Sequence, residues 1–237
     1  GVNAGNSIVS GGVNNVLVGD EAGTAISTGD QNVAIGYQAL EAEDTGSRNT
    51  AVGAYALKAL NNDAQSFNVA VGYAAGLKVS SGINNTAIGG NALYNSTTSN
   101  YQVAVGYNAL VSSVTHTVDA DAYNTAVGFK AGEANTTGIR NTLVGGLTGD
   151  ALTIGRYNTV MGAYALSNDD VGDDTVAIGY AALEDQASDS DNQAVNNTAV
   201  GANAGKQLTT GIQNTFLGGY CAAVGIVTGD DNVGVGY

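Results

Sequence analysis

The sequence predicts an all-β protein, a parallel β-solenoid of 17-residue coils that associates with copies of itself. Three observations support this prediction. A short motif with a glycine at its centre recurs along the whole chain, the composition is rich in glycine without proline, and the predicted strands are apolar in both directions. A stack of coils paired strand on strand satisfies all three, because each repeat is too small to bury its apolar residues alone.

The repeat is first clear at residues 32–40, NVAIGYQAL, and it returns as NTAVGAYAL at 49–57 and NTAVGFKAG at 124–132. Neighbouring copies are 17 residues apart, with insertions of 1, 2 or 5 residues that leave the register intact. We therefore expect one solenoid over 1–237, of about 13 coils, with loop insertions near 58–67, 111–123 and 184–196. A glycine occupies the same place in each copy: Gly19, Gly36, Gly53, Gly72, Gly89, Gly106, Gly128, Gly145, Gly162, Gly179, Gly201, Gly218 and Gly236.

An asparagine opens most copies of the motif, four residues before the glycine. Stacked coils would place these side chains in a column whose amides hydrogen-bond from one coil to the next. A row of ligand-binding amides is the alternative interpretation. The predicted ladder consists of Asn32, Asn49, Asn68, Asn85, Asn124, Asn141, Asn158, Asn197 and Asn214.

The predicted strands read Thr/Val-Ala-Val/Ile, without alternation of apolar and polar residues. Such a run is typical of a strand buried on both faces. One face can line the inside of a coil, and we expect self-association to cover the other. We expect a second short strand after the glycine, with about one aromatic residue per coil packed in a crowded interior or interface. Carbohydrate stacking is the alternative role for these rings.

Composition limits the partners. The chain has 35 glycines and no proline, and its 21 acidic and 7 basic residues give a net charge of −14. Binding to nucleic acid is excluded, because phosphate contacts need clustered Lys and Arg. No apolar run approaches the ~20 residues that cross a bilayer, so we expect no membrane insertion. The chain begins at Gly1 and stops within a motif at Tyr237, which indicates a piece of a longer protein.

Catalytic and metal-binding patterns are missing, so we predict that the chain is not an enzyme and has no catalytic, cofactor-binding or metal-binding residues. The one histidine, His116, lies in an insertion with Asp119 and Asp121, a weak basis for a catalytic triad. Acidic pairs at turns fit no known calcium-loop spacing, and we interpret them as solvated turns, with calcium binding left open. These pairs are Asp169–Asp170, Asp173–Asp174, Asp189/Asp191 and Asp230–Asp231.

The motif N-[TV]-A-[VI]-G-[YA]-x-A-[LG] resembles the repeat region of tailed-bacteriophage tail-fibre proteins, and it is similar to the β-roll heads of trimeric autotransporter adhesins. The resemblance covers nearly the whole chain. It implies a left-handed β-roll, a homotrimer, and an extracellular place on a virion tail fibre or a bacterial cell surface. It also implies attachment to a host-cell glycan or protein, through fibre loops or through a tip that the sequence lacks.

A monomeric ice-binding solenoid is the second interpretation. Threonine recurs three places before the glycine, at Thr50, Thr86, Thr125, Thr142, Thr159, Thr198 and Thr215. Valine replaces it in the other coils and interrupts the threonine plane.

Overall fold

The computed structural model describes residues 1–63, 65–114, 121–191, 193–222, 224–225 and 227–237. These residues form a parallel β-solenoid of about 12 turns and contain no helix. The chain divides into two compact units, Gly1–Ala122 (unit 1) and Tyr123–Tyr237 (unit 2). The predicted fold class, all-β and parallel with coils of about 17 residues, is confirmed.

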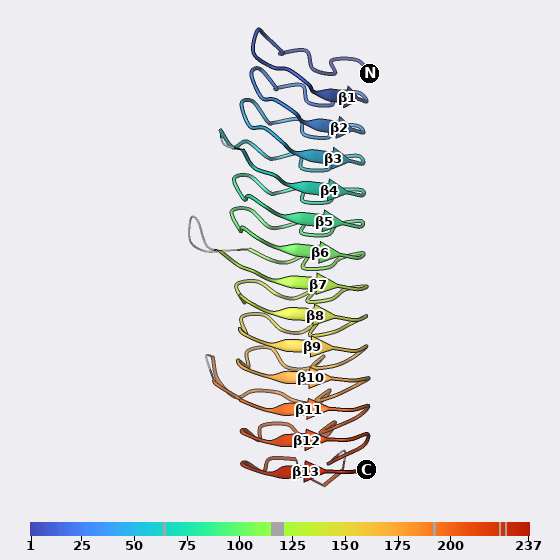
Figure 1. Cartoon of the computed structure of the whole chain (residues 1–237), viewed down its shortest axis with the longest axis vertical. Helices are drawn as coiled ribbons and strands as arrows, with labels where there is room; N and C mark the ends of the chain where they lie inside the picture. Colours follow the sequence, from blue (N-terminus) through green and yellow to red (C-terminus); the bar gives the residue numbers. More distant parts are fainter. Residues whose placement is uncertain (64, 115–120, 192, 223, 226) are drawn as a thin grey trace. The chain divides into compact units, whose positions relative to one another are not determined.

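Each coil contributes one strand of three residues. In unit 1 the strands are β1 (Val16–Val18), β2 (Val33–Ile35), β3 (Thr50–Val52), β4 (Val69–Val71), β5 (Thr86–Ile88) and β6 (Val103–Val105). In unit 2 they are β7 (Thr125–Val127), β8 (Thr142–Val144), β9 (Thr159–Met161), β10 (Val176–Ile178), β11 (Thr198–Val200), β12 (Thr215–Leu217) and β13 (Val233–Val235). Within each unit every strand lies beside the strands of the preceding and following coils (Figure 1).

The pairing is parallel and in register throughout each unit. In unit 1, Ala34 of β2 lies opposite Ala51 of β3, which lies opposite Ala70 of β4. In unit 2, the middle residues of β9, β10 and β11 align in the same way. Insertions between coils do not change this register, because they lie outside the strands.

The expected second strand after the glycine is absent from the described residues, and that prediction is wrong. The chain instead makes consecutive turns in which φ alternates in sign, as at Gly36 (φ 137°), Gln38 (φ 53°) and Leu40 (φ 53°). The N–H of Gln38 donates to Asp20 in the preceding coil, whereas the N–H of Leu40 donates to Ala56 in the following coil. Alternating φ thus pairs the backbone in both directions without extended structure.

The core lies inside the coils and is filled by small residues. The middle residue of each strand from β2 to β12 is buried, and it is alanine in most coils. Positions are counted from the repeat glycine, so that −1 precedes it and +1 follows it. The residues at +3, which are alanine in most coils, and those at +4 and +7 complete the interior, as Ala39, Leu40 and Glu43 do in the coil of Gly36.

The residues at +4 and +7 share the interior volume. Where +4 is leucine, +7 is mostly polar or small, and where +4 is glycine, +7 is mostly a large aliphatic residue. The leucine coils pair Leu40 with Glu43, Leu93 with Ser96, Leu110 with Ser113, Leu166 with Asp169 and Leu183 with Gln186. The glycine coils pair Gly23 with Ile26, Gly76 with Val79, Gly149 with Leu152 and Gly205 with Leu208. Leu57 with Leu60 and Gly132 with Asn135 depart from this rule.

Candidate association surface

The outer face of each sheet consists of side chains at −3 and −1. Because neighbouring strand residues point to opposite sides, the inward alanine at −2 leaves both of its neighbours outside. The −1 side chains are half-buried or exposed, and the most open of them in the sheet interior are Met161 (43% exposed) and Leu217 (50%). The strands are therefore apolar on both sides, but within one chain only the inner side is covered.

Aromatic side chains border this face on both margins. At +1 lie Tyr37, Tyr73, Tyr107, Phe129 and Tyr180, and at −5 lie Phe67, Tyr101, Tyr123 and Tyr157; all nine are exposed. The prediction that the rings after the glycine pack in an interior is wrong. They lie on the surface of the chain, and their packing in an interface between chains stays a prediction.

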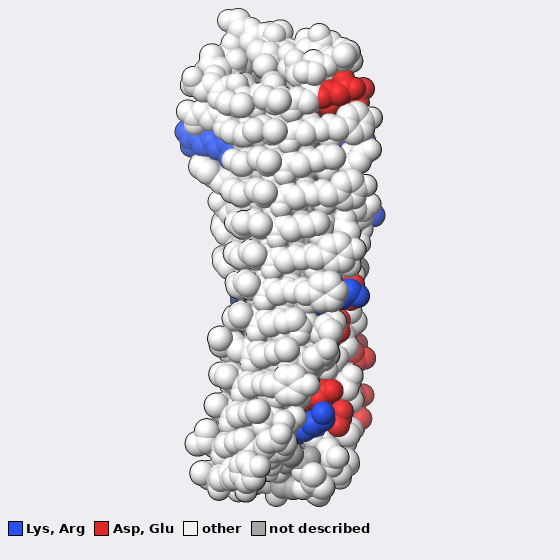
Figure 2. Space-filling model, turned by 90° about the vertical axis from the view of Figure 1, so that its right-hand side faces the viewer, with Lys and Arg blue, Asp and Glu red and all other residues white. Residues whose placement is uncertain are grey.

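Charged residues avoid the sheet face. Among the described residues, none of the strands β1–β13 contains Lys, Arg, Asp or Glu. Most ion pairs of the described residues lie on the turns after the glycine, such as Lys58 with Glu41 (3.2 Å) in unit 1 and Lys206 with Glu184 (2.7 Å) in unit 2. The pair of Arg156 with Asp173 lies before the strands. In the face shown in Figure 2, acidic atoms lie toward the right-hand edge, basic atoms lie there and at the upper left edge, and most of the surface is uncharged. We call the surface formed by positions −3 and −1 the sheet face. Its margins at −5 and +1 carry aromatic residues in some coils and charged residues in others, namely Asp20, Arg48, Arg140, Asp174 and Asp231.

The sheet face of unit 1, together with its margin at +1, alternates between large and small coils. From β2 to β6, coils with valine at −3 carry tyrosine at +1, and coils with threonine at −3 carry alanine or glycine at +1; Val16 of β1, with Asp20 at +1, departs from this rule. In order, these pairs are Val33/Tyr37, Thr50/Ala54, Val69/Tyr73, Thr86/Gly90 and Val103/Tyr107. The tyrosines at +1 thus recur in every second coil, about 10 Å apart. Between Tyr37 and Tyr73, the ring of Tyr55 at +2 packs against both.

Unit 2 follows the same pairing rule with a different order. Val176/Tyr180 and Val233/Tyr237 are large coils, whereas Thr142/Gly146, Thr159/Ala163, Thr198/Ala202 and Thr215/Gly219 are small ones. Thr125 with Phe129 departs from the rule. In both units, threonine at −3 therefore accompanies a small residue at +1 in most coils.

The predicted asparagine ladder lies inside the coils, and all nine of its side chains are at most 2% exposed. The ligand-binding alternative would need these amides at the surface, where they do not lie. Where ladder residues occupy successive coils, the side-chain oxygen of the first accepts a hydrogen bond from the backbone N–H of the second. In unit 2, for example, the Asn141 Oδ1 accepts from the Asn158 N–H (3.0 Å), and the Asn158 Nδ2 donates to the Gly172 carbonyl (2.9 Å).

Other polar side chains continue the interior network where asparagine is replaced. Gln102 takes the ladder position in its coil, accepts from Ser113 (2.8 Å) and donates to Ser96 (3.0 Å). In the coil of Thr175, Gln186 donates to Thr175 (3.2 Å) and accepts from Asn197 (3.0 Å). Serine and glutamine at +7 thus supply hydrogen bonds at the two interruptions of the column.

The repeat glycines form a second column at the corner that follows the strands. Their φ angles lie between 126° for Gly89 and 147° for Gly145, a range that side chains other than glycine rarely adopt. A Cβ atom on Gly72 would lie 2.7 Å from the backbone of Gly89 in the next coil. The glycines therefore serve both backbone conformation and close stacking of the corners.

Of the candidate catalytic groups, the structure describes only Asp121. His116 and Asp119 lie outside the described residues, so the structure does not place them. The described part of the chain holds no cluster of three or more His, Cys, Asp or Glu that is suited to a metal ion. Cys221 is a free, buried thiol at the +3 position of its coil.

Two of the acidic turn residues are not solvated as expected. Asp169 is fully buried, where its carboxylate accepts from Gln186 (2.5 Å) and from the N–H of Gly172 (3.2 Å). Asp173 is 5% exposed and pairs with Arg156 at 3.0 Å. These carboxylates hold turns together within unit 2, which explains their presence without a bound cation.

The three insertions begin after the turns that follow the glycine. Each returns just before the next strand, where it lies beside the residues that precede the strand of the previous coil. Isolated parallel bridges mark the returns, at Ser47 with Gln65, Asn100 with Asp121 and Asp173 with Ala194. Residues 64, 115–120 and 192 within the insertions lie outside the described residues. A receptor contact through 111–123 or 184–196 stays a prediction.

Comparisons with protein-family models, with curated proteins and with solved structures gave no match. The described residues also contain no helix with the length and apolar character needed to cross a membrane. The fold defines the class of protein, a parallel β-solenoid repeat protein, and its function is argued from the surface.

Sequence reasoning missed the volume rule at +4 and +7 and the link between −3 and +1. Both were visible in the repeat as correlated substitutions, leucine with polar residues and valine with tyrosine. Correlated positions of this kind indicate contact or a shared space.

Proposed function

We propose that the chain is a segment of a homotrimeric attachment fibre, the shaft of a phage tail fibre or of a bacterial cell-surface adhesin. Its role is structural, without catalysis, and extracellular. The observation that carries the proposal is the sheet face, which is regular, apolar and free of charged residues within its strands. Large exposed apolar patches on soluble proteins mark interaction sites.

The size of the sheet face supports association with a sister chain. The three strand residues of each coil span about 10 Å, and the six or seven coils of one unit span about 30 Å. The strands of each unit thus present roughly 300 Å², which the aromatic residues at −5 and +1 widen, and contiguous apolar patches of this size often mark interaction sites. Charged turns on the rest of the coil would keep such an assembly soluble.

The aromatic margin of unit 1 also supports association. Tyr55 packs edge-on against Tyr37 and Tyr73, with ring centres 5.3 and 5.7 Å apart, so the three rings form a continuous apolar edge beside the strands. Aromatic residues are enriched at interfaces between proteins.

Mass measurement tests the assembly. The 23.5 kDa chain is expected to sediment as three copies, about 70 kDa. Val71→Lys and Val105→Lys each place a charge in the middle of the sheet face and should lower the mass toward one copy, because an unpaired charge at an interface is costly. Gln207→Lys adds the same charge on an exposed turn and is the control. A monodisperse monomer or dimer of the unaltered chain would contradict the proposal.

Ice binding is the second candidate, and the outward threonines favour it. In unit 2, Thr125, Thr142 and Thr159 lie side by side at −3 on three consecutive strands. Since ice binding needs the same face open to water, it competes with association. Thermal hysteresis from a monomeric chain would support ice binding over the fibre.

A further inference from the structure

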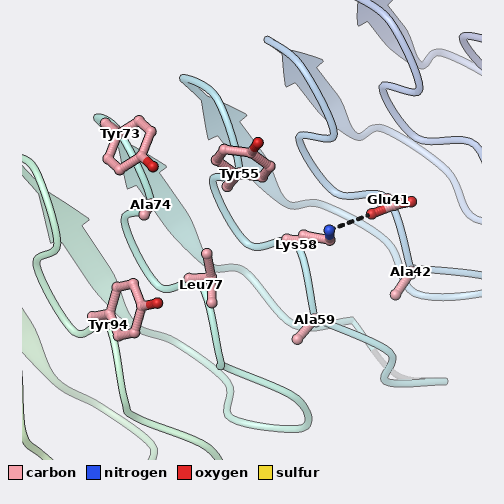
Figure 3. A pocket seen from close by; sticks show the side chains of 9 residues that line it. All are labelled: Glu41, Ala42, Tyr55, Lys58, Ala59, Tyr73, Ala74, Leu77 and Tyr94. Carbon is pink, nitrogen blue, oxygen red and sulfur yellow. Dashed lines mark ion pairs between the residues drawn. The ribbon is translucent and has the colours of Figure 1, made fainter.

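A groove of about 510 Å³ opens on the turn side of unit 1, away from the strands. Figure 3 shows its side chains, which come from the turns of four successive coils. Alanines form part of the lining, and aromatic rings and Leu77 rise around them. The lining residues are Glu41, Ala42, Tyr55, Lys58, Ala59, Tyr73, Ala74, Leu77 and Tyr94.

A second hollow of about 430 Å³ continues the groove toward the following coil. The two share Tyr73 and Tyr94, and the second adds the amides of Asn91, Asn95 and Asn108 with Val111. Together they cross four strand spacings, about 19 Å. The combined groove thus changes along its length from mainly aromatic to rich in amides.

The two charged residues of the lining, Glu41 and Lys58, are paired with each other. The Lys58 ammonium lies 3.2 Å from Glu41 and donates to Gln38 (2.8 Å), and it stands 5.4 Å from the centre of the Tyr55 ring. At the other end, Lys78 donates to Asn95 (2.8 Å) and lies 5.4 Å from the Tyr94 ring centre. A ligand for this groove is therefore expected to be uncharged.

We propose that this groove binds a neutral oligosaccharide. The exposed ring of Tyr73 and the half-buried ring of Tyr94 offer flat apolar surface for the C–H side of a pyranose, and the asparagine amides offer both donors and acceptors for its hydroxyl groups. Tyr73 and Tyr94 serve both hollows and are the stacking residues, while Asn91 and Asn95 bind hydroxyl groups. Apolar walls with a few placed polar groups are the usual character of small-ligand sites.

A sister chain is the competing occupant, and the geometry favours the saccharide. Apart from Tyr73 at the margin, the lining lies at +2, +5 and +6, outside the sheet face. The groove is concave and carries an ion pair and amides, in contrast to the uncharged strands. All its residues belong to unit 1 of a single chain, so the site does not depend on the proposed assembly.

The test uses the full chain with cellohexaose, maltohexaose and mannohexaose as neutral probes and hexagalacturonate as a charged one. Saturation-transfer NMR should show contact with at least one neutral probe, and titration calorimetry its affinity. Tyr94→Ala should weaken that affinity about five-fold or more, because it removes one of the rings that stack on the sugar. Ala59→Leu should weaken it by narrowing the groove, and Tyr157→Ala in unit 2 is the matched control.

The outcomes separate this proposal from the fibre. Contact with no neutral probe, contact with hexagalacturonate alone, or an affinity that Tyr94→Ala leaves unchanged would overturn the saccharide site. A fall in sedimentation mass for Tyr94→Ala, without loss of saccharide affinity, would assign the groove to a sister chain. Failure of the unaltered chain to form a trimer bears on the fibre alone.

Discussion

The side-chain oxygen of Asn141 accepts a hydrogen bond from the backbone N–H of Asn158, the residue one coil further along (3.0 Å). Asn158 repeats the arrangement with the N–H of Thr175 (2.9 Å), and its amide nitrogen reaches the Gly172 carbonyl (2.9 Å). Each ladder amide therefore satisfies buried backbone groups at two corners, and the column links successive coils through the interior.

Removal of one ladder amide should be costly. Asn158→Ala leaves the Thr175 N–H and the Gly172 carbonyl without the bonds that they form with this side chain. We expect a loss of about 2–4 kcal/mol in the free energy of unfolding. Denaturant unfolding measures it, with the exposed Gln207→Ala as control. A change below about 1 kcal/mol would show that the ladder contributes little.

Two adjacent glycines provide a matched test of the glycine column. Gly145 has φ 147°, and a Cβ there would clash with Thr148 Oγ1 and lie 2.7 Å from the Gly162 carbonyl group, whereas a Cβ on Gly146 meets nothing within 4 Å. Gly145→Ala should destabilise the protein by more than about 3 kcal/mol or prevent folding. Gly146→Ala should leave the midpoint of thermal unfolding nearly unchanged. Equal effects of the two substitutions would contradict this account.

Asn135 is a buried polar residue at +7 of a coil with glycine at +4, where most such coils have a large aliphatic side chain. It is fully buried beside Gly132, and both polar atoms of its side chain lack hydrogen-bond partners. Because an unsatisfied amide is costly to bury, Asn135→Leu should raise the free energy of unfolding by about 1–3 kcal/mol. Leu152→Asn, the reverse change one coil later, should lower it. Chemical denaturation checks both, and a destabilised Asn135→Leu would contradict the rule.

Glu43 should make stability depend on pH. Burial raises the pKa of its carboxyl group to about 7, although the N–H of Gly46 donates to it (2.8 Å). A folded pKa above the unfolded value of 4.5 means that the folded chain binds the proton more tightly. Its contribution is therefore full below pH 4.5 and is lost as pH rises to about 7.

Glu43→Gln should remove this dependence. Relative to the unaltered chain, the variant should gain on the order of 2 kcal/mol at pH 8 compared with pH 4, because its side chain does not ionise. Unfolding in urea at both pH values measures the difference. Asp189→Asn, at an exposed position of unit 2, is the control. Parallel pH profiles for Glu43→Gln and the unaltered chain would show that the carboxyl group stays ionised in the fold.

Much of the fold follows from the repeat. Glycines at a fixed spacing, the asparagine before each strand and insertions that keep register are enough to predict parallel coils of 17 residues. The stretch after the glycine was predicted wrongly as a strand, because Leu40 and Gln38 are not residues that indicate positive φ. The exchange of leucine with glycine at +4, as between Leu57 and Gly76, was the signal that this position is left-handed.

By itself, the sequence determined the coil, because its period, its small interior residues and its glycines all specify one repeating backbone path. Only the tertiary structure decided which side chains face water. Because the middle residue of each strand, in most coils an alanine, points inward, the valine or threonine beside it points outward, and the tyrosines at +1 are exposed as well. The turns after the glycine bring Tyr73, Tyr94 and Asn95 into one groove. Such groupings join residues from several coils, and they exist only once φ at each turn is fixed.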